Sequence, residues 1–183
     1  MSNIYTLTDI EKLKDRDIFF DTNILLYLFW PTQSHYYERT YSKIFNQLLK
    51  QKNNLYIDFI VISEIINRVI RIEYENYLED NYVPKNTIKF KEFRDGKTGK
   101  ETLEDIFTII DKKIFKFFEV TTKDFNKKEI KTFFKVNSLD FSDKGIEKIC
   151  IDNNYILLTN DSDFLDSKVD LLTINKKLIN NMK

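Results

Sequence analysis

Acidic side chains stand beside apolar segments at four places in this 183-residue chain. Asp21 directly follows a short apolar run, and Asp161 comes two residues after another. Glu64 and Asp143 each stand near the start of a segment with helical apolar spacing. Carboxylates gathered without His or Cys are the ligands that hard divalent cations such as Mg²⁺ and Mn²⁺ prefer. The pattern raises the hypothesis of a metal-dependent site, provided that the fold brings these acids together.

Asp21 and Glu64 also have ordinary structural interpretations. Asp21 with Thr22 and Asn23 is common chemistry for a turn from a strand into a helix. Glu64 and Arg68 are four residues apart, so on a helix they can form an exposed ion pair worth a few tenths of a kcal/mol. Periodicity alone favours these interpretations over a site.

The other two acids have alternatives of the same kind. Asp143 lies in the first turn of a predicted helix but on its apolar side, and both it and Asp140 are suited to cap that helix. Asp161 and Asp163 have the spacing of an Asx-turn pair. A calcium loop is excluded because Asp166 occupies the position that requires glycine.

Strand and helix patterns alternate along the chain. Apolar runs predict strands at residues 18–20, 55–59, 155–159 and 169–174. Apolar residues at three- and four-residue spacing predict helices at 7–13, 24–30, 34–50, 61–79, 102–118, 125–136, 140–153 and 176–182. This alternation predicts a three-layer α/β/α fold with a central, mainly parallel sheet. The acids that follow strands would then meet at its carboxyl edge.

The middle of the chain interrupts this pattern. Residues 80–100 contain Pro84, Gly96, Gly99 and many charges, which indicates a loop. We expect one domain over residues 1–183 with a charged loop and helical insertion at about 75–135. A phosphate-binding loop at residues 96–100 is rejected because its spacing is wrong and no apolar strand precedes it.

Composition limits the class of protein. Lys and Arg total 29, as do Asp and Glu, so the chain has no overall basic field. The one cysteine, Cys150, excludes an internal disulfide. The amino terminus lacks the pattern of a signal peptide and no apolar run is long enough to span a membrane, so we expect a cytoplasmic protein without membrane association.

Charge is unevenly distributed. Residues 85–135 contain 14 basic and 9 acidic residues, whereas acidic residues are in excess on both sides of this segment. A basic surface beside an acidic cluster would attract phosphates to a site whose carboxylates repel them. The ordinary alternative is a solvated, lysine-rich helix face.

Together these segments resemble the PIN-domain nucleases, and most nearly the bacterial toxins of VapC type and their relatives. The resemblance covers residues 1–72 and 138–175. It rests on four motifs in chain order: Asp21-Thr22-Asn23, Glu64 in the helix after the second strand, Asp143 in Asp-Lys-Gly-Ile, and the run from Thr159 through Asp161 and Asp163 to Phe164. Residues 75–135 are longer and more charged than in a compact toxin, and Gly145 stands where a larger residue is expected.

The resemblance implies that four acids hold one or two Mg²⁺ or Mn²⁺ ions and act in catalysis: Asp21, Glu64, Asp143 and Asp161. It adds Asp163 as a further metal ligand, and Asn23 and Thr159 as hydrogen-bonding supports. The bound ions would activate water, and the products would be a 5′-phosphate and a 3′-hydroxyl.

The expected substrate is RNA, cut endonucleolytically, and one form of this function is the toxin of a toxin–antitoxin pair. The balanced charge argues against tight binding of duplex DNA, where phosphate contacts supply nearly all the affinity. Four basic residues are expected to guide the substrate: Arg68, Lys127, Lys128 and Lys131.

Two alternatives and two partners complete the hypothesis. A haloacid-dehalogenase-type phosphatase needs a second aspartate where Asn23 stands, so it is rejected. A catalytically inactive PIN-like module that binds RNA or a protein stays open. An excess of apolar and aromatic residues in residues 24–49 suggests a homodimer or an antitoxin surface, the alternative being a thicker core: Leu28, Phe29, Trp30, Tyr36 and Tyr37.

Overall fold

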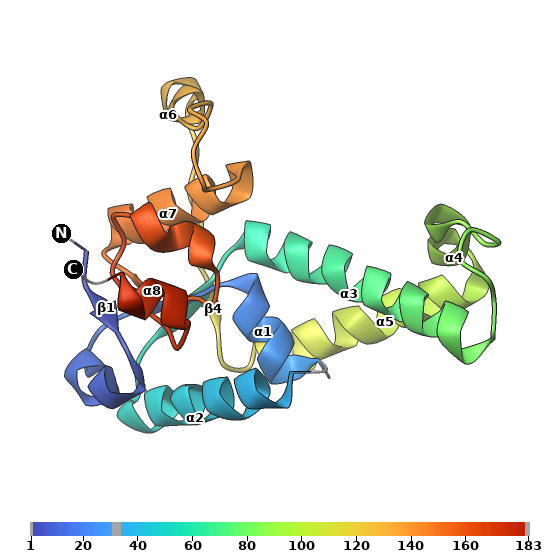
Figure 1. The fold of residues 1–183 in the computed structure, drawn as a ribbon, viewed down its shortest axis with the longest axis horizontal. Helices are drawn as coiled ribbons and strands as arrows, with labels where there is room; N and C mark the ends of the chain where they lie inside the picture. The colour runs from blue at the N-terminus through green and yellow to red at the C-terminus, as the bar shows by residue number, and fades with distance from the viewer. Residues whose placement is uncertain (1, 31–33, 182–183) are drawn as a thin grey trace. The chain divides into compact units, whose positions relative to one another are not determined.

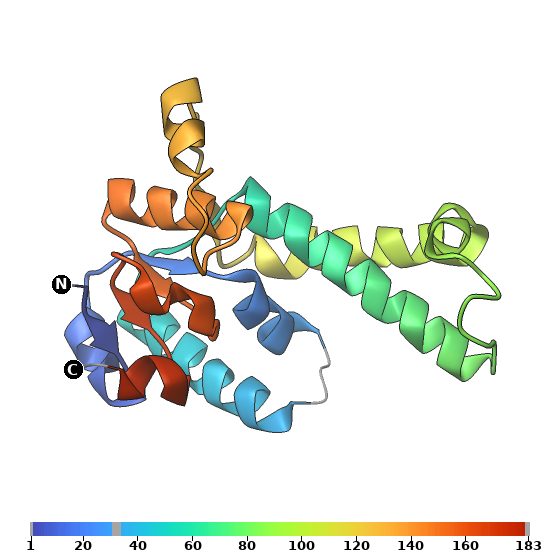
Figure 2. The same ribbon diagram turned by 45° about the horizontal axis from the view of Figure 1, so that its top comes forward.

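The computed structural model describes residues 2–30 and 34–181, and Figures 1 and 2 show the chain from two directions. It divides into two compact units. Met1–Val61 and Phe118–Lys183 form the first, which we call the sheet unit, and Ile62–Phe117 form the second, the helical unit. The predicted insertion at 75–135 overlaps the helical unit only as far as residue 117, and residues 118–135 belong to the sheet unit.

A single parallel sheet forms the centre of the sheet unit. Its strand order is β1-β6-β5-β2-β3-β4, and every pair of neighbours among the described strands is parallel. The strands are β1 (Ile4–Tyr5), β2 (Ile18–Phe20), β3 (Leu55–Ile57), β4 (Glu119–Val120), β5 (Ile156–Leu158) and β6 (Leu171–Leu172). The predicted mainly parallel sheet is therefore confirmed.

The central strands β2 and β5 are buried along their whole length. They pair in register, with Ile18 opposite Ile156 and Phe20 opposite Leu158. Strands covered on both faces read as continuous apolar runs, which is why the sequence located them. The edge strands β1 and β4 were not predicted because each has only two residues, and those of β4 are exposed.

Helices cover both faces of this sheet. The sheet unit contains η1 (Leu7–Leu13), α1 (Thr22–Phe29), α2 (His35–Gln51), α6 (Lys127–Thr132), α7 (Phe141–Asn153), η3 (Ser162–Asp166) and α8 (Lys176–Asn180), and α6 stands away from the sheet beyond α7 in both views (Figures 1 and 2). Helices α1 and α2 lie on one face and α7 on the other, as both views show, which makes the predicted three layers (Figures 1 and 2).

Two of these helices differ from their predicted ranges. The helix expected at residues 125–136 is reduced to α6: Asn126 caps its start, and helical structure ends at Thr132. Helix α8 ends at Asn180, and the predicted end at Met182 lies outside the described residues.

The helical unit contains most of the long helix α3 (Phe59–Asp80), which begins in the sheet unit. It also contains α4 (Phe90–Asp95), α5 (Lys97–Ile109) and the π-helical turn η2 (Ile110–Ile114). Within this unit, α3 and α5 run obliquely to each other in both views (Figures 1 and 2). In the described part of the chain, no helix is both long and apolar enough to cross a membrane.

The predicted loop at residues 80–100 is partly wrong, because α4 and the start of α5 lie within it. Gly99 is not a loop residue: a Cβ atom there would lie 2.2 Å from the carbonyl oxygen of Phe93. Glycine is needed because the two helices pack backbone against backbone at their junction. The same residue type that marks loops here permits close helix packing, so the sequence signal was misread.

An ion-pair network joins the segment before α6 to α7. Lys123 Nζ lies 3.0 Å from Glu129 Oε1 and 2.7 Å from Asp152 Oδ2, and Lys148 also pairs with Asp152. Hydrogen bonds from Lys123 and Lys148 lower the pKa of Asp152. Because several charges share the network, it is more effective than an isolated surface pair.

We expect Lys123→Met to lower the midpoint of thermal unfolding, since Met keeps the aliphatic stem but leaves Glu129 and Asp152 with Lys148 as their one shared cation among the described residues. The difference should shrink in 1 M NaCl, which screens charges. Lys127→Met is the matched control, because Lys127 is exposed and forms no ion pair with any described residue. Equal effects of the two substitutions would show that the network does not hold α6 in place.

Candidate functional site

The strand order reverses between β2 and β5. From β2 the chain proceeds to β3 and β4 on one side, and it returns to β5 and β6 on the other. Loops that leave such neighbouring strands diverge, so a crevice forms outside their carboxyl ends, and ligands of open α/β sheets bind there. Asp21 directly follows β2, and Thr159 directly follows β5. The sequence therefore places polar side chains on both sides of the switch point.

Asp21 is held by neutral donors from both sides of the crevice. Its side chain is buried, with the residue 5% exposed. Its Oδ2 atom accepts hydrogen bonds from Asn23 Nδ2 at 2.6 Å and from Thr159 Oγ1 at 2.5 Å. The two predicted supporting residues thus contact the predicted acid directly, although a role in metal binding stays a prediction.

The turn after β5 is ordered by the same threonine. The backbone N–H of Asp161 donates to Thr159 Oγ1 at 2.9 Å, and the N–H of Asp163 donates to Asp161 Oδ1 at 2.9 Å. Asp161 therefore caps η3, which is the Asx-type arrangement that the spacing allowed. This capping uses Asp161 Oδ1 and orients the carboxylate.

Asp143 enters from the opposite helical layer. It forms a reciprocal capping box with Asp140: the Asp143 N–H donates to Asp140 Oδ1 at 2.8 Å, and the Asp140 N–H donates to Asp143 Oδ2 at 3.3 Å. Burial raises the pKa of Asp143 to about 7, and the negative charges of Asp140, Asp21 and Asp161 add to this shift. Three of the four predicted acids are thus close enough to affect one another electrostatically.

These acids interact without forming a closed coordination cage. Within residues 2–30 and 34–181, no three Asp, Glu, His or Cys side chains lie close enough together to hold a metal ion as they stand. The arrangement is a cluster of negative charge supported by neutral donors. Such a cluster favours a cation over any anionic ligand.

Glu64 and Arg68 belong to the helical unit. Arg68 Nη2 lies 2.6 Å from Glu64 Oε1, so the i, i+4 ion pair that their spacing allowed is present. Both side chains are partly exposed. A role for Glu64 as a metal ligand, and for Arg68 in substrate binding, stays a prediction.

The predicted substrate-guiding lysines lie on α6 in the sheet unit. Lys127, Lys128 and Lys131 are exposed, and none of them forms an ion pair with another described residue. The helical unit, by contrast, contains 11 basic and 11 acidic residues, because acids of α3 balance the lysines of residues 85–117. The positive charge available to a substrate is thus more local than the sequence window indicated.

Sequence reasoning missed the residues that hold the turn after β5 from outside. Tyr41 of α2 donates to Asn160 Oδ1 at 2.8 Å, and Asn175 Nδ2 donates to the Asn160 carbonyl at 2.7 Å. The Asn160 N–H in turn donates to Asn23 Oδ1 at 3.2 Å. Burial raises the pKa of Tyr41, which therefore stays a neutral donor. A tyrosine on the buried face of an amphipathic helix was the only available signal.

Asp58 was also missed. It directly follows β3, the neighbour of β2, and it is buried while its Oδ1 accepts a hydrogen bond from the Val61 N–H at 2.9 Å. An acid directly after a strand is the signal that located Asp21, so Asp58 could have been found. Burial, with the charges of Asp58 and Asp21, raises the pKa of the buried Cys150 thiol on α7.

We expect Thr159→Val to lower the free energy of unfolding by about 1–3 kcal/mol, because it removes a donor to buried Asp21 and an acceptor for the Asp161 N–H. Val has nearly the same shape, so urea denaturation should report the lost hydrogen bonds. Thr122→Val, at an exposed position, should change little. Equal stability of the Thr159 variant and the wild type would mean that these bonds contribute nothing net.

A second prediction concerns Asp143. Its folded pKa of about 7 exceeds the ordinary value of 3.8, so the folded state binds the proton more tightly than the unfolded chain. This carboxyl group therefore destabilises the cation-free protein increasingly as pH rises from about 4 to 7. Asp143→Asn removes that cost and should raise the free energy of unfolding at pH 8 by about 1–2 kcal/mol, after allowance for solvent screening of a half-buried group.

Urea denaturation in EDTA at pH 4, 6 and 8 measures this effect. The gain should be largest at pH 8 and small near pH 4, where the folded-state carboxyl is neutral and the unfolded one has only begun to lose its proton. Asp124→Asn, at an exposed position, is the control. A gain that does not depend on pH would contradict the assigned cause.

The chain was compared with protein-family models and with curated proteins. No protein-family model matches the chain. A search of curated proteins likewise found no match. Any functional conclusion must therefore come from the residues and their geometry.

Proposed function

We propose that this protein is a divalent-metal-dependent endoribonuclease of the PIN type. The observation that supports this proposal most is the grouping of Asp21, Asp143 and Asp161 from three distant segments at the switch point of a parallel sheet. Structural capping accounts for each residue singly. It gives no reason for Asp21 and Asp161 to lie close enough for their charges to add to the effects of burial and of Asp140, which raise the pKa of Asp143 to about 7.

The donor set fits Mg²⁺ or Mn²⁺ by its chemistry. Asp21, Asp143 and Asp161 offer only oxygen atoms, and their mutual repulsion is what a bound cation relieves. These three residues would hold one or two ions, and the resemblance adds Glu64 and Asp163. When bound, the metal supplies an activated water and neutralises charge on the phosphate.

The chain's own residues would orient and tune the ligands. Asn23 and Thr159 fix the Asp21 carboxylate through Oδ2, and partners that orient a metal ligand strongly affect metal affinity. Asp140 holds Asp143 through the capping box. Asp143, with a pKa of about 7, exchanges a proton near neutral pH, so cation binding at that pH would release part of a proton from its carboxyl group.

RNA is the proposed substrate. The net charge is zero, so the affinity for an arbitrary duplex should be low, and α6 offers three exposed lysines that form no ion pair with a described residue. An unpaired, flexible strand can adapt to such a local surface and present its bases. The second candidate function is an inactive RNA- or protein-binding module, which the same lysines would also serve.

A toxin role with an antitoxin partner or a homodimer belongs to this proposal as well. Tyr27 stacks on Tyr41 at 5.6 Å and contacts Tyr37 at 5.3 Å, so much of the aromatic excess packs within the sheet unit. Tyr36 stays largely exposed. Of the five residues named for this excess, Phe29 and Tyr37 pack against other rings, so the thicker-core interpretation accounts for part of the excess, and Tyr36 is the residue to vary in a test of association.

We expect Asp21→Asn to reduce RNA cleavage by about 100-fold or more while the protein stays folded, because the change keeps size but removes a ligand charge. Total RNA and a defined single-stranded oligonucleotide are incubated with Mn²⁺, and new 5′ ends are mapped. Circular dichroism checks the fold.

Asp124→Asn serves as the matched control, since it removes one exposed carboxylate elsewhere, and EDTA should abolish activity. Unchanged cleavage by the Asp21 variant would place the reaction elsewhere. Cleavage without metal, or a preference for duplex DNA, would overturn the proposal. Binding of RNA without any cleavage by the wild type would favour the inactive module.

A further inference from the structure

An apolar cavity of about 210 Å³ opens in the sheet unit beside the amino end of α7. Its walls come from α3, α6, α7 and the segment before α6: Ile60, Phe125, Ile130, Phe133, Phe141 and Gly145. Pockets for drug-sized ligands measure roughly 300–1,000 Å³, so this one suits a single flat ring system. Ser142 supplies a hydroxyl group at its edge.

The cavity exists where Gly145 lacks a side chain. A Cβ atom at this position would lie 2.9 Å from Ile60 Cδ1 and 3.8 Å from Phe125 Cζ. Glycine inside a helix is less favourable than alanine, so a helix-interior glycine needs a reason. Leaving room between α7 and the two apolar walls is a reason that the geometry supplies.

The cavity adjoins the acidic cluster through α7. Ser142 and Gly145 both line it, and Asp143 lies between them in the same helix. A ligand group in the cavity would therefore be bound next to the helical turn that carries the acid with a pKa of about 7.

The rim of the cavity suits a nucleobase. Phe141 is 57% exposed and packs edge-on against Phe133, with ring centroids 5.8 Å apart. Phe134, 66% exposed, stacks beside Phe141 at 6.4 Å. Exposed rings of this kind bind bases by stacking, which tolerates any base because each has a π-face.

Charge around the cavity points to a polyanion. Helix α6, which contributes Ile130 to the wall, also carries Lys127, Lys128 and Lys131 without ion-pair partners in the described part of the chain. Lys144 Nζ donates to the carbonyl oxygens of Phe133 and Lys135, which fixes the end of α6 beside α7. Cations next to exposed aromatics are the combination that single-stranded nucleic acids use.

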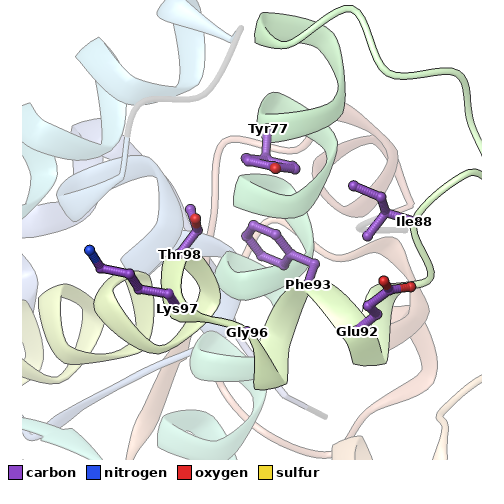
Figure 3. Close-up of a pocket in the computed structure, with 7 residues that line it drawn as sticks. All are labelled: Tyr77, Ile88, Glu92, Phe93, Gly96, Lys97 and Thr98. Carbon is purple, nitrogen blue, oxygen red and sulfur yellow. The ribbon is translucent and has the colours of Figure 1, made fainter.

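A second cavity, in the helical unit, lacks this combination. It measures about 290 Å³ and is formed around Tyr77 and Phe93 (Figure 3). Glu92 contributes a carboxylate to its lining, and Lys97 points away from the two rings towards the side where it pairs with Glu101. A phosphate would gain little there.

We propose that the cavity under Phe141 binds an unpaired base of single-stranded RNA, with the flanking phosphates directed to the lysines of α6 and to the acidic cluster. This inference rests on the proposed function for its choice of substrate. It assigns the base-binding subsite, which would position the strand for cleavage and favour unpaired over paired RNA.

Fluorescence of a single-stranded RNA hexamer with one 2-aminopurine tests the proposal, because stacking quenches that base. The full chain carrying Asp21→Asn is titrated in Mg²⁺, so that binding is separated from cleavage. Phe141→Ala should weaken binding by about 5- to 100-fold and abolish quenching. Gly145→Ala should also weaken binding and quenching, because its methyl group pushes Ile60 into the cavity.

Tyr82→Ala is the control: Tyr82 is an aromatic residue 94% exposed in the helical unit, and its loss should change nothing. Affinity and quenching that are equal in all variants would overturn the subsite, even if the wild type cleaves RNA. Displacement of the hexamer by an apolar peptide at a far lower concentration than by unlabelled RNA would assign the cavity to a protein partner instead. Pocket-dependent binding by a wild type that never cleaves would sustain the subsite and refute the nuclease.

Discussion

The burial of one carboxylate, that of Asp21, is the constraint on which the rest of this structure depends. A buried charge is costly unless hydrogen bonds satisfy it, and here the donors are neutral groups from both sides of the switch point. Asn23 belongs to the helix after β2, and Thr159 follows β5, so the same bonds that satisfy the charge also join the two central strands' loops. Asn23 and Thr159 are neutral, so their hydrogen bonds solvate the carboxylate without adding positive charge of their own.

Much of the sheet could be predicted because its central strands are apolar on both faces. Strands β2, β3 and β5 follow from this pattern, whereas β1 and β4 form by backbone pairing of two-residue segments without a composition signal. The three acids of the sheet unit were located because each stands at the end of a predicted element. The bond from Tyr41 to Asn160 could not be foreseen, since it joins residues 119 positions apart and only the packed fold brings them together. Asp58 had a usable signal that a preference for the familiar motif obscured.

The net charge of a segment of the sequence differs from the net charge of the folded unit to which it belongs. The window 85–135 is basic, but it cuts across two units, and one of them balances its lysines with the acids of α3. The lysines of α6 remain without partners among the described residues, while nearby Lys123 and Lys148 are neutralised by Glu129 and Asp152. Electrostatic attraction is thus a property of the surface of a unit. The strength of this attraction depends on which charged side chains form ion pairs in the folded protein.

The reactivity of the single thiol, that of Cys150, can report local opening of this protein. Cys150 lies on the buried side of α7, and burial and neighbouring carboxylates raise its pKa, so the folded state holds almost none of the reactive thiolate. Because Cys150 is 1% exposed, an alkylating reagent can reach the sulfur only when the structure around it opens locally. Its rate of reaction therefore counts those openings, in the same way that amide exchange counts local unfolding. Because Asp143 is on the same helix, a thiol assay would follow the integrity of the acidic cluster in a sample that contains no substrate and no labelled residue.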